Sequence, residues 1–229
     1  MVDPGPLSRA RSALQRYREN SHWAAVLSRE VLWLVVVVGG IALGLFLACG
    51  TWPAVVAVES ESMVPNMQVG DLVVVVAKDR FGEIRTYEDG AATGYEKFGM
   101  YGDVIVYRPN GAGSVHPIIH RAMRYEENVT SFQNHVYPEP QTGYLTKGDN
   151  NQLYDQGTYY PGIGFIEPVE EQWVVGKALF SVPLLGYPTL HYLEFAAVVV
   201  VIMILYELWS GRKEEAAPAE KKKTRKKKR

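Results

Sequence analysis

The feature that most constrains this chain is an uncharged apolar run over residues 31–49, VLWLVVVVGGIALGLFLAC. A helix rises about 1.5 Å per residue, so a run of this length approaches the roughly 30 Å hydrocarbon thickness of a bilayer. No side chain in the run could satisfy the backbone of a loop in lipid, which favours a helix. A second, weaker run covers residues 190–209, where Glu194 and Glu207 lie near the ends and can reach the lipid headgroups. The sequence therefore predicts two transmembrane helices.

Basic residues gather at the two ends of the chain. Residues 1–30 carry five Arg against three acidic residues, and residues 210–229 carry ten Lys or Arg against three Glu. Residues 31–209 carry nine basic and nineteen acidic residues, which argues against nucleic acid as a partner. Because cytoplasmic flanks of membrane helices are rich in Lys and Arg, we expect both ends to be cytoplasmic. Residues 50–189 would then lie on the extracytoplasmic side of the cell membrane.

The ends of the chain leave two alternatives open. Residues 31–49 could form a signal peptide that is removed. However, the thirty residues before this run are long for the basic n-region of a signal peptide. The run KKKTRKKKR at residues 221–229 is typical of a solvated tail beside anionic lipid, and a specific partner site is the alternative.

The pattern of residues 50–189 predicts β structure. Gly and Pro recur about every ten residues between short β-branched runs, as in antiparallel domains. The candidate strands cover residues 72–77, 104–107, 115–120, 129–132, 144–146 and 173–179. Residues 55–185 show no convincing helical stripe, and the polar, Gly-rich segment 79–101 is expected to be an insertion or loop. We therefore expect a mainly β fold, with one compact antiparallel domain between two membrane helices.

Three polar segments of this domain could carry chemistry. Ser62 lies thirteen residues after Cys49 in SESMVPNM (60–67), which keeps it within roughly 40 Å of the bilayer even in a fully extended chain. Taken alone, a serine at a turn before a strand more often bonds its own backbone than acts as a nucleophile. The segment TKGDNNQLYD (146–155) is similarly typical of a surface turn, and a carboxylate that orients an imidazole is its functional alternative.

The third segment contains His116 and His120. Pro117 disfavours a helix through this segment, and on a strand the two rings would be about 13 Å apart, too far to share a metal ion. The single cysteine, Cys49, excludes an internal disulfide and a Cys-based zinc site. A lone His on an apolar strand is usually a core residue, and the alternative is a general base, because imidazole titrates near neutral pH.

Taken together, these segments resemble type I signal peptidases of the archaeal and endoplasmic-reticulum form. The resemblance covers about residues 55–187 in the same order, and residues 79–101 depart from it as an insertion. The motifs that carry it are S-x-S-M-x-P at 60–65, V-G-D at 69–71, G-D-V-I-V at 102–106, I-H-R at 119–121, K-G-D-N-N at 147–151 with Asp155, and the segment 174–187.

The resemblance implies the roles of individual residues. Ser62 would be the nucleophile, and His120 would replace the lysine base of bacterial members. Asp155 is the first choice for the carboxylate that orients His120, and Asp149 follows closely as a structural or catalytic carboxylate. Ser60, with the backbone N–H of Ser62, would bind the oxyanion. Neither a cofactor nor a metal is expected.

The resemblance also implies a function. It predicts a membrane-bound serine endopeptidase that removes N-terminal signal peptides from preproteins after small residues, with the lipid bilayer and the Sec translocon as partners. The alternatives are a membrane-tethered serine peptidase of the same fold with a regulatory substrate, and a non-catalytic membrane-anchored β module. Asn128 begins a glycosylation sequon, Asn-Val-Thr, whose modification the sequence leaves open.

Overall fold

The computed structural model describes residues 7, 11–12, 15, 17 and 22–215, with side chains as far as residue 209. Most of the predicted basic segment 1–30 and all of the basic run 221–229 therefore lie outside the described residues.

One long helix precedes the folded domain in the sequence and another follows it. The first, α2 (Trp23–Cys49), begins after His22, whose Nδ1 accepts a hydrogen bond from the backbone N–H of Ala24 at 3.3 Å. It ends at Gly50, whose φ of 74° is the left-handed conformation common where helices stop. The helix is therefore longer than the predicted 31–49, because hydrogen-bonded helix continues beyond the purely apolar part of the sequence.

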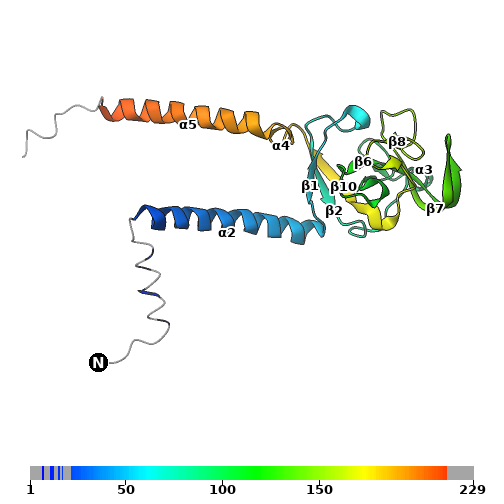
Figure 1. Ribbon diagram of the computed structural model, residues 1–229, viewed down its shortest axis with the longest axis horizontal. Helices are drawn as coiled ribbons and strands as arrows, with labels where there is room; N and C mark the ends of the chain where they lie inside the picture. The colour runs from blue at the N-terminus through cyan, green and yellow to red at the C-terminus, as the bar shows by residue number, and fades with distance from the viewer. Residues whose placement is uncertain (1–6, 8–10, 13–14, 16, 18–21, 216–229) are drawn as a thin grey trace, which may run out of the picture.

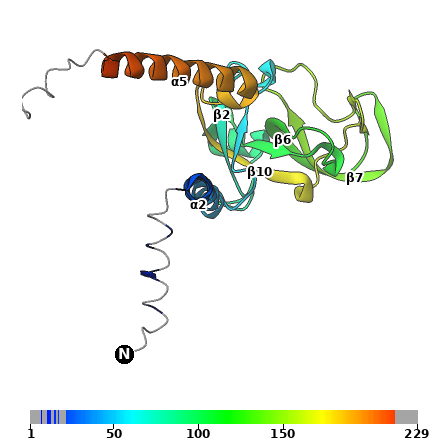
Figure 2. The ribbon, with the colours of Figure 1, turned by 60° about the vertical axis from the view of Figure 1, so that its left-hand side comes forward.

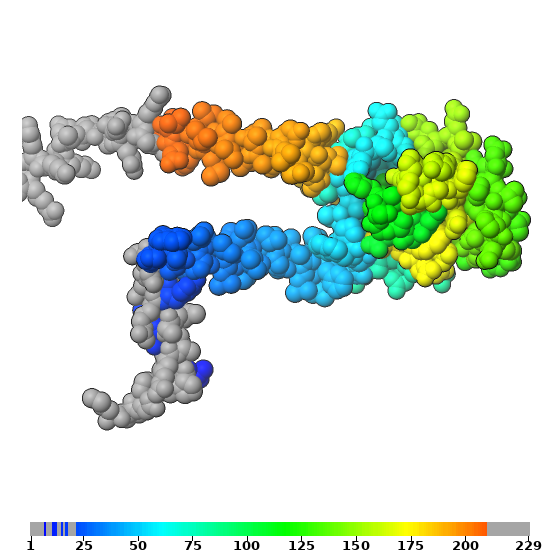
Figure 3. Space-filling view, viewed as in Figure 1, coloured from blue at the N-terminus to red at the C-terminus, as the bar shows by residue number. Residues whose placement is uncertain are grey.

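The second long helix is α5 (Tyr192–Glu215), which follows the short helix α4 (Tyr187–Leu190). Both α2 and the part of α5 from Tyr192 to Trp209 are long and apolar enough to cross a membrane, and their most apolar windows contain no buried residue. They leave the same end of the domain, as Figures 1 and 2 show, and stand apart along their lengths in the space-filling view of Figure 3.

The domain is built on a six-stranded sheet in the order β1-β2-β10-β5-β6-β7, with antiparallel pairing throughout. Its strands are β1 (Val55–Ala57), β2 (Leu72–Val76), β5 (Val104–Tyr107), β6 (Ile118–Phe132), β7 (His135–Lys147) and β10 (Val174–Val182). The predicted mainly β fold between two apolar helices is confirmed.

Strands β6 and β7 are longer than the sequence predicted. Polar residues such as Glu126 and Glu127 interrupt the apolar pattern of β6, so only the segments 115–120 and 129–132 had the appearance of strands. The two strands pair with three shifts in register, which change the face to which successive side chains point. A simple alternation of apolar and polar residues could not reveal such a hairpin.

The segment 79–101 is folded rather than a bare loop. It contains a helix that the sequence did not predict, α3 (Tyr87–Thr93), and a small hairpin of β3 (Glu96–Lys97) and β4 (Met100–Tyr101). The helix is too short for an apolar stripe, but the side chains of Thr86 and Asp89 form a reciprocal capping box at its start. That pair was the local signal for the helix.

Buried polar groups attach this segment to the sheet. The carboxylate of Asp103 accepts hydrogen bonds from the backbone N–H of Arg85 at 3.0 Å and from the Tyr95 hydroxyl at 2.9 Å. Lys177, on the central strand β10, donates from Nζ to the carbonyl of Gly82 at 2.7 Å. Burial lowers the pKa of Lys177, since desolvation disfavours its charged form.

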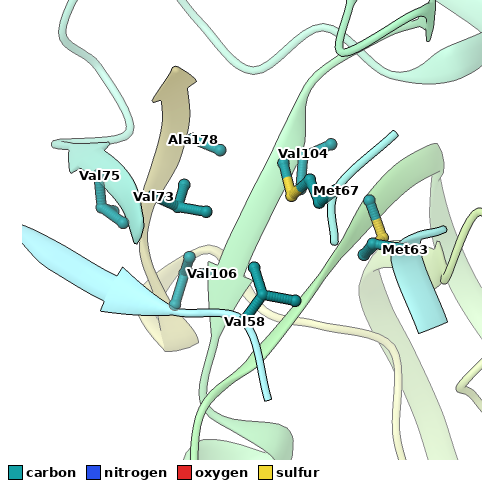
Figure 4. Close-up of a cluster of buried hydrophobic side chains, with 8 residues drawn as sticks. All are labelled: Val58, Met63, Met67, Val73, Val75, Val104, Val106 and Ala178. Carbon is teal, nitrogen blue, oxygen red and sulfur yellow. The ribbon is translucent and has the colours of Figure 1, made fainter. Parts of the chain in front are cut away.

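The hydrophobic core fixes the turn that contains Ser62. Figure 4 shows eight buried side chains from the strands and from this turn: Val58, Met63, Met67, Val73, Val75, Val104, Val106 and Ala178. Met63, the last residue of this turn, and Met67, four residues later, are 0% and 1% exposed. Burying such a side chain stabilises the fold by about 1.5–3 kcal/mol, so the two methionines anchor the turn to the sheet.

The remaining small elements connect the strands of the sheet. Strands β8 (Tyr159–Tyr160) and β9 (Gly164–Phe165) form a hairpin, and 3-10 turns cover Glu61–Met63 (η1), Pro109–Gly111 (η2) and Glu171–Trp173 (η3). The first of these turns carries the candidate nucleophile.

Candidate active site

Ser62 is presented by a tight turn at the edge of the sheet. It is the middle residue of η1, which connects β1 to β2. The residue after it, Met63, is buried, while the backbone N–H groups of Asn66 and Met67 both donate to the Met63 carbonyl at 2.9 Å. The Ser62 side chain is thus held on a short, anchored segment and remains partly exposed.

His120 connects the serine to a carboxylate. It lies on β6 opposite Ile105 of β5 and is 7% exposed. Its Nε2 is 2.9 Å from the Oγ of Ser62, and its Nδ1 is 2.7 Å from Oδ2 of Asp155. The structure therefore brings three residues, separated by up to 93 positions in the chain, into one line of hydrogen bonds.

The chemistry of the groups determines where the protons lie. An ionised carboxylate has no proton to give, so Nδ1 of His120 must donate to Asp155. In the neutral ring Nε2 then carries a lone pair and accepts the proton of the Ser62 hydroxyl. The hydroxyl of Ser60, 3.1 Å from that of Ser62, can in turn donate to the Ser62 oxygen. This is the arrangement in which a serine is ready to lose its proton.

Asp155 is held by more than the imidazole. Its backbone N–H donates to the carbonyl of Thr146 at 2.9 Å. Its Oδ2 also contacts the hydroxyl of Thr146 at 2.6 Å and that of Tyr107 at 2.9 Å. Neither hydroxyl was predicted from the sequence to belong to the site, because Tyr107 ends an apolar strand and Thr146 precedes a turn. Only their three-dimensional position connects them to it.

Asp149, the other candidate carboxylate, has a different partner. Its two oxygens accept from Nε and Nη2 of Arg121 at 2.8 and 2.7 Å, and Oδ2 also accepts from the side-chain amide of Asn66 at 2.8 Å. The structure therefore places Asp155 at the imidazole and Asp149 at a guanidinium. The catalytic role of each carboxylate remains a prediction.

Arg121 belongs to the I-H-R motif, although no role was predicted for it, and its side chain is a buried structural anchor. Its side chain is 0% exposed, and Nη1 donates to the backbone carbonyls of Lys97 at 3.0 Å and Gly102 at 2.8 Å. It thus joins the end of the segment 79–101 to the turn that contains Asp149. Its position next to His120 on a strand was the available signal, since neighbouring strand residues point to opposite faces.

Gly148 allows the turn with Asp149 to approach the serine closely. A Cβ at this position would lie 2.6 Å from the carbonyl oxygen of Ser62 and 2.9 Å from Nε2 of His120. The backbone N–H of Asn150 donates to that Ser62 carbonyl at 2.8 Å, and its side-chain amide donates to the carbonyl of Glu61 at 3.1 Å. Glycine is therefore required for this contact between the two motifs.

A cleft of about 530 Å³ opens beside Ser62 and His120. Its apolar lining comes from Val56, Ala57, Val106, Ile118, Ile119 and Ile166. Two charged or titratable side chains also line the cleft: the exposed His116 and, 3.3 Å from its Nδ1, the carboxylate of Glu59. A cleft with apolar walls, a serine and a buried His–Asp pair can bind an extended chain and carry out acyl transfer.

The amino-acid sequence is similar to those of curated proteins over much of the domain. The chain is 40% identical over 103 residues to the signal peptidase complex catalytic subunit SEC11 of Schizophyllum commune, covering 41% of this chain and 49% of the relative. It is 29% identical over 168 residues to the catalytic subunit SEC11C of Rattus norvegicus, covering 72% of each. A third relative, SEC11 of Debaryomyces hansenii, is 29% identical over 59% of this chain and 64% of its own length.

These similarities confirm the resemblance to signal peptidases of the endoplasmic-reticulum type that the motifs predicted. The chain spans about half the length of the Schizophyllum relative. No family model matches the chain.

Proposed function

We propose that this chain is a membrane-bound serine endopeptidase that removes N-terminal signal peptides from preproteins. The observation that carries the proposal is the hydrogen-bonded line from Ser62 through His120 to Asp155 at the wall of an apolar cleft. The printed names of the relatives, which are catalytic subunits of signal peptidase complexes, support the same activity.

The mechanism follows from the positions of the protons. The oxygen of Ser62 attacks the scissile carbonyl while Nε2 of His120 takes its proton and later passes it to the leaving amine. Asp155 keeps the ring in the correct tautomer and stabilises the imidazolium that forms. The Ser60 hydroxyl and the backbone N–H of Ser62 would bind the oxyanion, where losing one donor typically costs about 3 kcal/mol. Collapse of the tetrahedral intermediate breaks the peptide C–N bond and leaves the acyl group on Ser62. A water molecule that gives a proton to Nε2 of His120 then attacks this ester, which releases the new carboxylate and returns the proton to Ser62.

The cleft suggests how a signal peptide would bind. Strand β1 is the edge of the sheet, and its residues Val56 and Ala57 line the cleft. An edge strand offers unpaired backbone groups with which an extended peptide can pair. The apolar walls around Val106 and Ile119 would then receive the side chains that precede the cut, and the resemblance to signal peptidases implies that these are small.

The two apolar helices support a membrane location for the enzyme. Because their surfaces are exposed in the folded chain, lipid is the environment that would cover them. We propose a multi-pass protein of the cell membrane with residues 31–49 and 190–209 in the bilayer, residues 50–189 outside, and both ends in the cytoplasm. Preproteins and lipid would be its immediate partners, and the Sec translocon would deliver the substrate.

An engineered cysteine can test this orientation. The natural Cys49 is buried, whereas Val136 on β7 is 74% exposed. In intact cells a membrane-impermeant maleimide should label a Val136→Cys variant and leave the wild-type chain unlabelled. Labelling of this variant only after the cells are broken would contradict the proposed orientation.

The activity itself is tested by cleavage in a membrane. The wild-type chain and Ser62→Ala, reconstituted in vesicles, are given a secretory preprotein and a soluble peptide that spans the same cut site without the apolar segment. Wild type should cleave the preprotein after a small residue, as sequencing of the new N-terminus shows, and Ser62→Ala should not. Equal cleavage by both chains would refute the proposal, and a preference for the soluble peptide would favour a regulatory peptidase.

A further inference from the structure

We infer that the hydroxyl groups of Tyr107 and Thr146 position the catalytic carboxylate, because both donate to the oxygen of Asp155 that holds His120. The inference rests on the proposed function and adds two positioning residues to it. Neither residue touches Ser62 or lies where a substrate would react; each acts through Asp155.

The three hydrogen bonds converge on one atom. Oδ2 of Asp155 lies 2.7 Å from Nδ1 of His120, 2.6 Å from Oγ1 of Thr146 and 2.9 Å from Oη of Tyr107. All four residues are buried, with exposures of 7% for His120 and Asp155 and 0% for Thr146 and Tyr107. Hydrogen bonds to an ionised acceptor in such surroundings are stronger than those between neutral groups.

Each hydroxyl has one proton, and the surroundings indicate where it goes. The side-chain amide of Gln156 donates to Oγ1 of Thr146 at 3.0 Å, which leaves the Thr146 proton for Asp155. Tyr107 and Thr146 also lie 3.1 Å apart, but two hydroxyls that both donate to the carboxylate cannot donate to each other. The contact between them is therefore a consequence of their shared acceptor.

Tyr107 is a dependable donor at any pH at which the reaction would run. Burial, followed by the negative charge of Asp155, raises the pKa of its hydroxyl well above the usual value. The hydroxyl consequently stays protonated. Its proton therefore remains available for the hydrogen bond to Oδ2 of Asp155.

The sheet brings these groups together. Tyr107 ends β5, His120 lies near the start of β6, and Thr146 lies near the end of β7, which are three neighbouring strands. With donors arriving from β5 and β7, the carboxylate of Asp155 cannot rotate away from the ring on β6 without losing hydrogen bonds. The two hydroxyls thus fix the direction of the bond to His120.

Two nearly isosteric variants test the inference. Tyr107→Phe and Thr146→Val remove one hydroxyl each, and Thr146→Ser restores the hydroxyl at its position. Because a hydrogen bond to a charged group contributes on the order of 1.5–3 kcal/mol, each deletion should lower kcat about 10- to 100-fold. The KM for the preprotein should not change, because neither residue lines the cleft. Thr146→Ser should recover most of the wild-type kcat.

Tyr137→Phe is the matched control. Tyr137 is 4% exposed, and its hydroxyl donates to the carbonyl of Ile166 at 3.2 Å, a hydrogen bond that does not involve Asp155. This variant should lose a similar amount of thermal stability and keep the wild-type kcat.

Three results would overturn the inference. They are a wild-type kcat in both deletion variants, a rise in KM with kcat unchanged, and a loss of kcat in Tyr137→Phe as large as in Tyr107→Phe. The failure of the proposed function is distinguishable, because then wild type itself does not cleave the preprotein beyond the level of Ser62→Ala. The positioning role would fall with it.

Discussion

Two carboxylates, six residues apart in the same loop, have different surroundings in this molecule. Asp155 faces an imidazole and two hydroxyls, and the pair with His120 lies beside the cleft. Asp149 faces the guanidinium of Arg121 through two hydrogen bonds, away from the reacting serine. Their partners, His120 and Arg121, are neighbours on β6.

The difference shows how strand geometry gives two neighbouring residues different roles, His120 at the reacting serine and Arg121 in the supporting structure. Successive side chains of a strand point to opposite faces, so one of the two neighbours reaches the serine and the other is buried beneath it. The guanidinium of arginine is always charged, so the Arg121 side chain provides a permanent counter-charge for the Asp149 carboxylate. Histidine gains its charge only when it accepts a proton, so the charge of Asp155 stabilises an intermediate of the proposed reaction.

Of the substitutions that compare the two carboxylates and their surroundings, Asp155→Asn should have the largest effect. Loss of the charge and of the correct tautomer is expected to lower kcat about 10⁴-fold, while the fold persists. Steady-state cleavage, together with thermal unfolding of the same preparation, gives both quantities. If Asp155→Asn were fully active and Asp149→Asn were folded but inactive, the roles of the two carboxylates would be exchanged.

Asp149→Asn should affect stability rather than chemistry. Removing one partner of a buried ion pair leaves the Arg121 charge uncompensated, which typically costs about 3–5 kcal/mol. Chemical unfolding should show this loss, and the rate per folded molecule should stay near that of wild type. Arg121→Met, combined with Asp149→Asn in a double-mutant cycle, should show strong coupling; additive losses would contradict the direct pairing.

Gly148→Ala tests the contact that joins the two regions. The new methyl group would meet the Ser62 carbonyl at 2.6 Å and Nε2 of His120 at 2.9 Å, so the turn must move. We expect a stability loss of about 1–3 kcal/mol and a reduced kcat together. Gly113→Ala is a suitable control, because a Cβ there has no atom within 4 Å. Equal behaviour of the two variants would show that the close approach is unimportant.

The smallest expected effect concerns Lys177 on β10, whose ammonium group donates to the carbonyl of Gly82 at the start of the segment 79–101. Burial lowers its pKa below the ordinary 10.5, so the folded chain releases this proton at lower pH than the unfolded chain does. Between those two pH values the unfolded state binds more protons, and stability rises with pH. The stability of wild type relative to Lys177→Met should therefore increase from neutral pH toward about pH 10. A difference between the two chains that is constant over that range would contradict this.

Much of the fold was predictable because the relevant signals are local. The β-branched runs became β2, β5 and part of β10, and the apolar runs became the long helices. The missed features depend on distant contacts or on short capping motifs. The helix α3 needed the Thr86–Asp89 capping box, and the extent of β6 depends on its pairing with β7.

The same distinction holds for the site. Ser62, His120 and Asp155 were predicted as catalytic residues from motifs and not from the separate segments, and the structure places their side chains within hydrogen-bond distance of one another. No role was predicted for Tyr107 or for Arg121, although Arg121 belongs to the I-H-R motif, because the neighbours of these residues in the sequence do not indicate their partners. Their partners lie 48 and 28 residues further along the chain and become visible only in the folded sheet.

The central claim is that His120 activates Ser62 and no other serine. A serine-directed acylating reagent, followed by peptide mass spectrometry, tests this directly on the full chain in detergent. Wild type should carry one acyl group on Ser62, and His120→Ala should carry almost none. An adduct on Ser60, or equal labelling of Ser62 in both chains, would contradict the account.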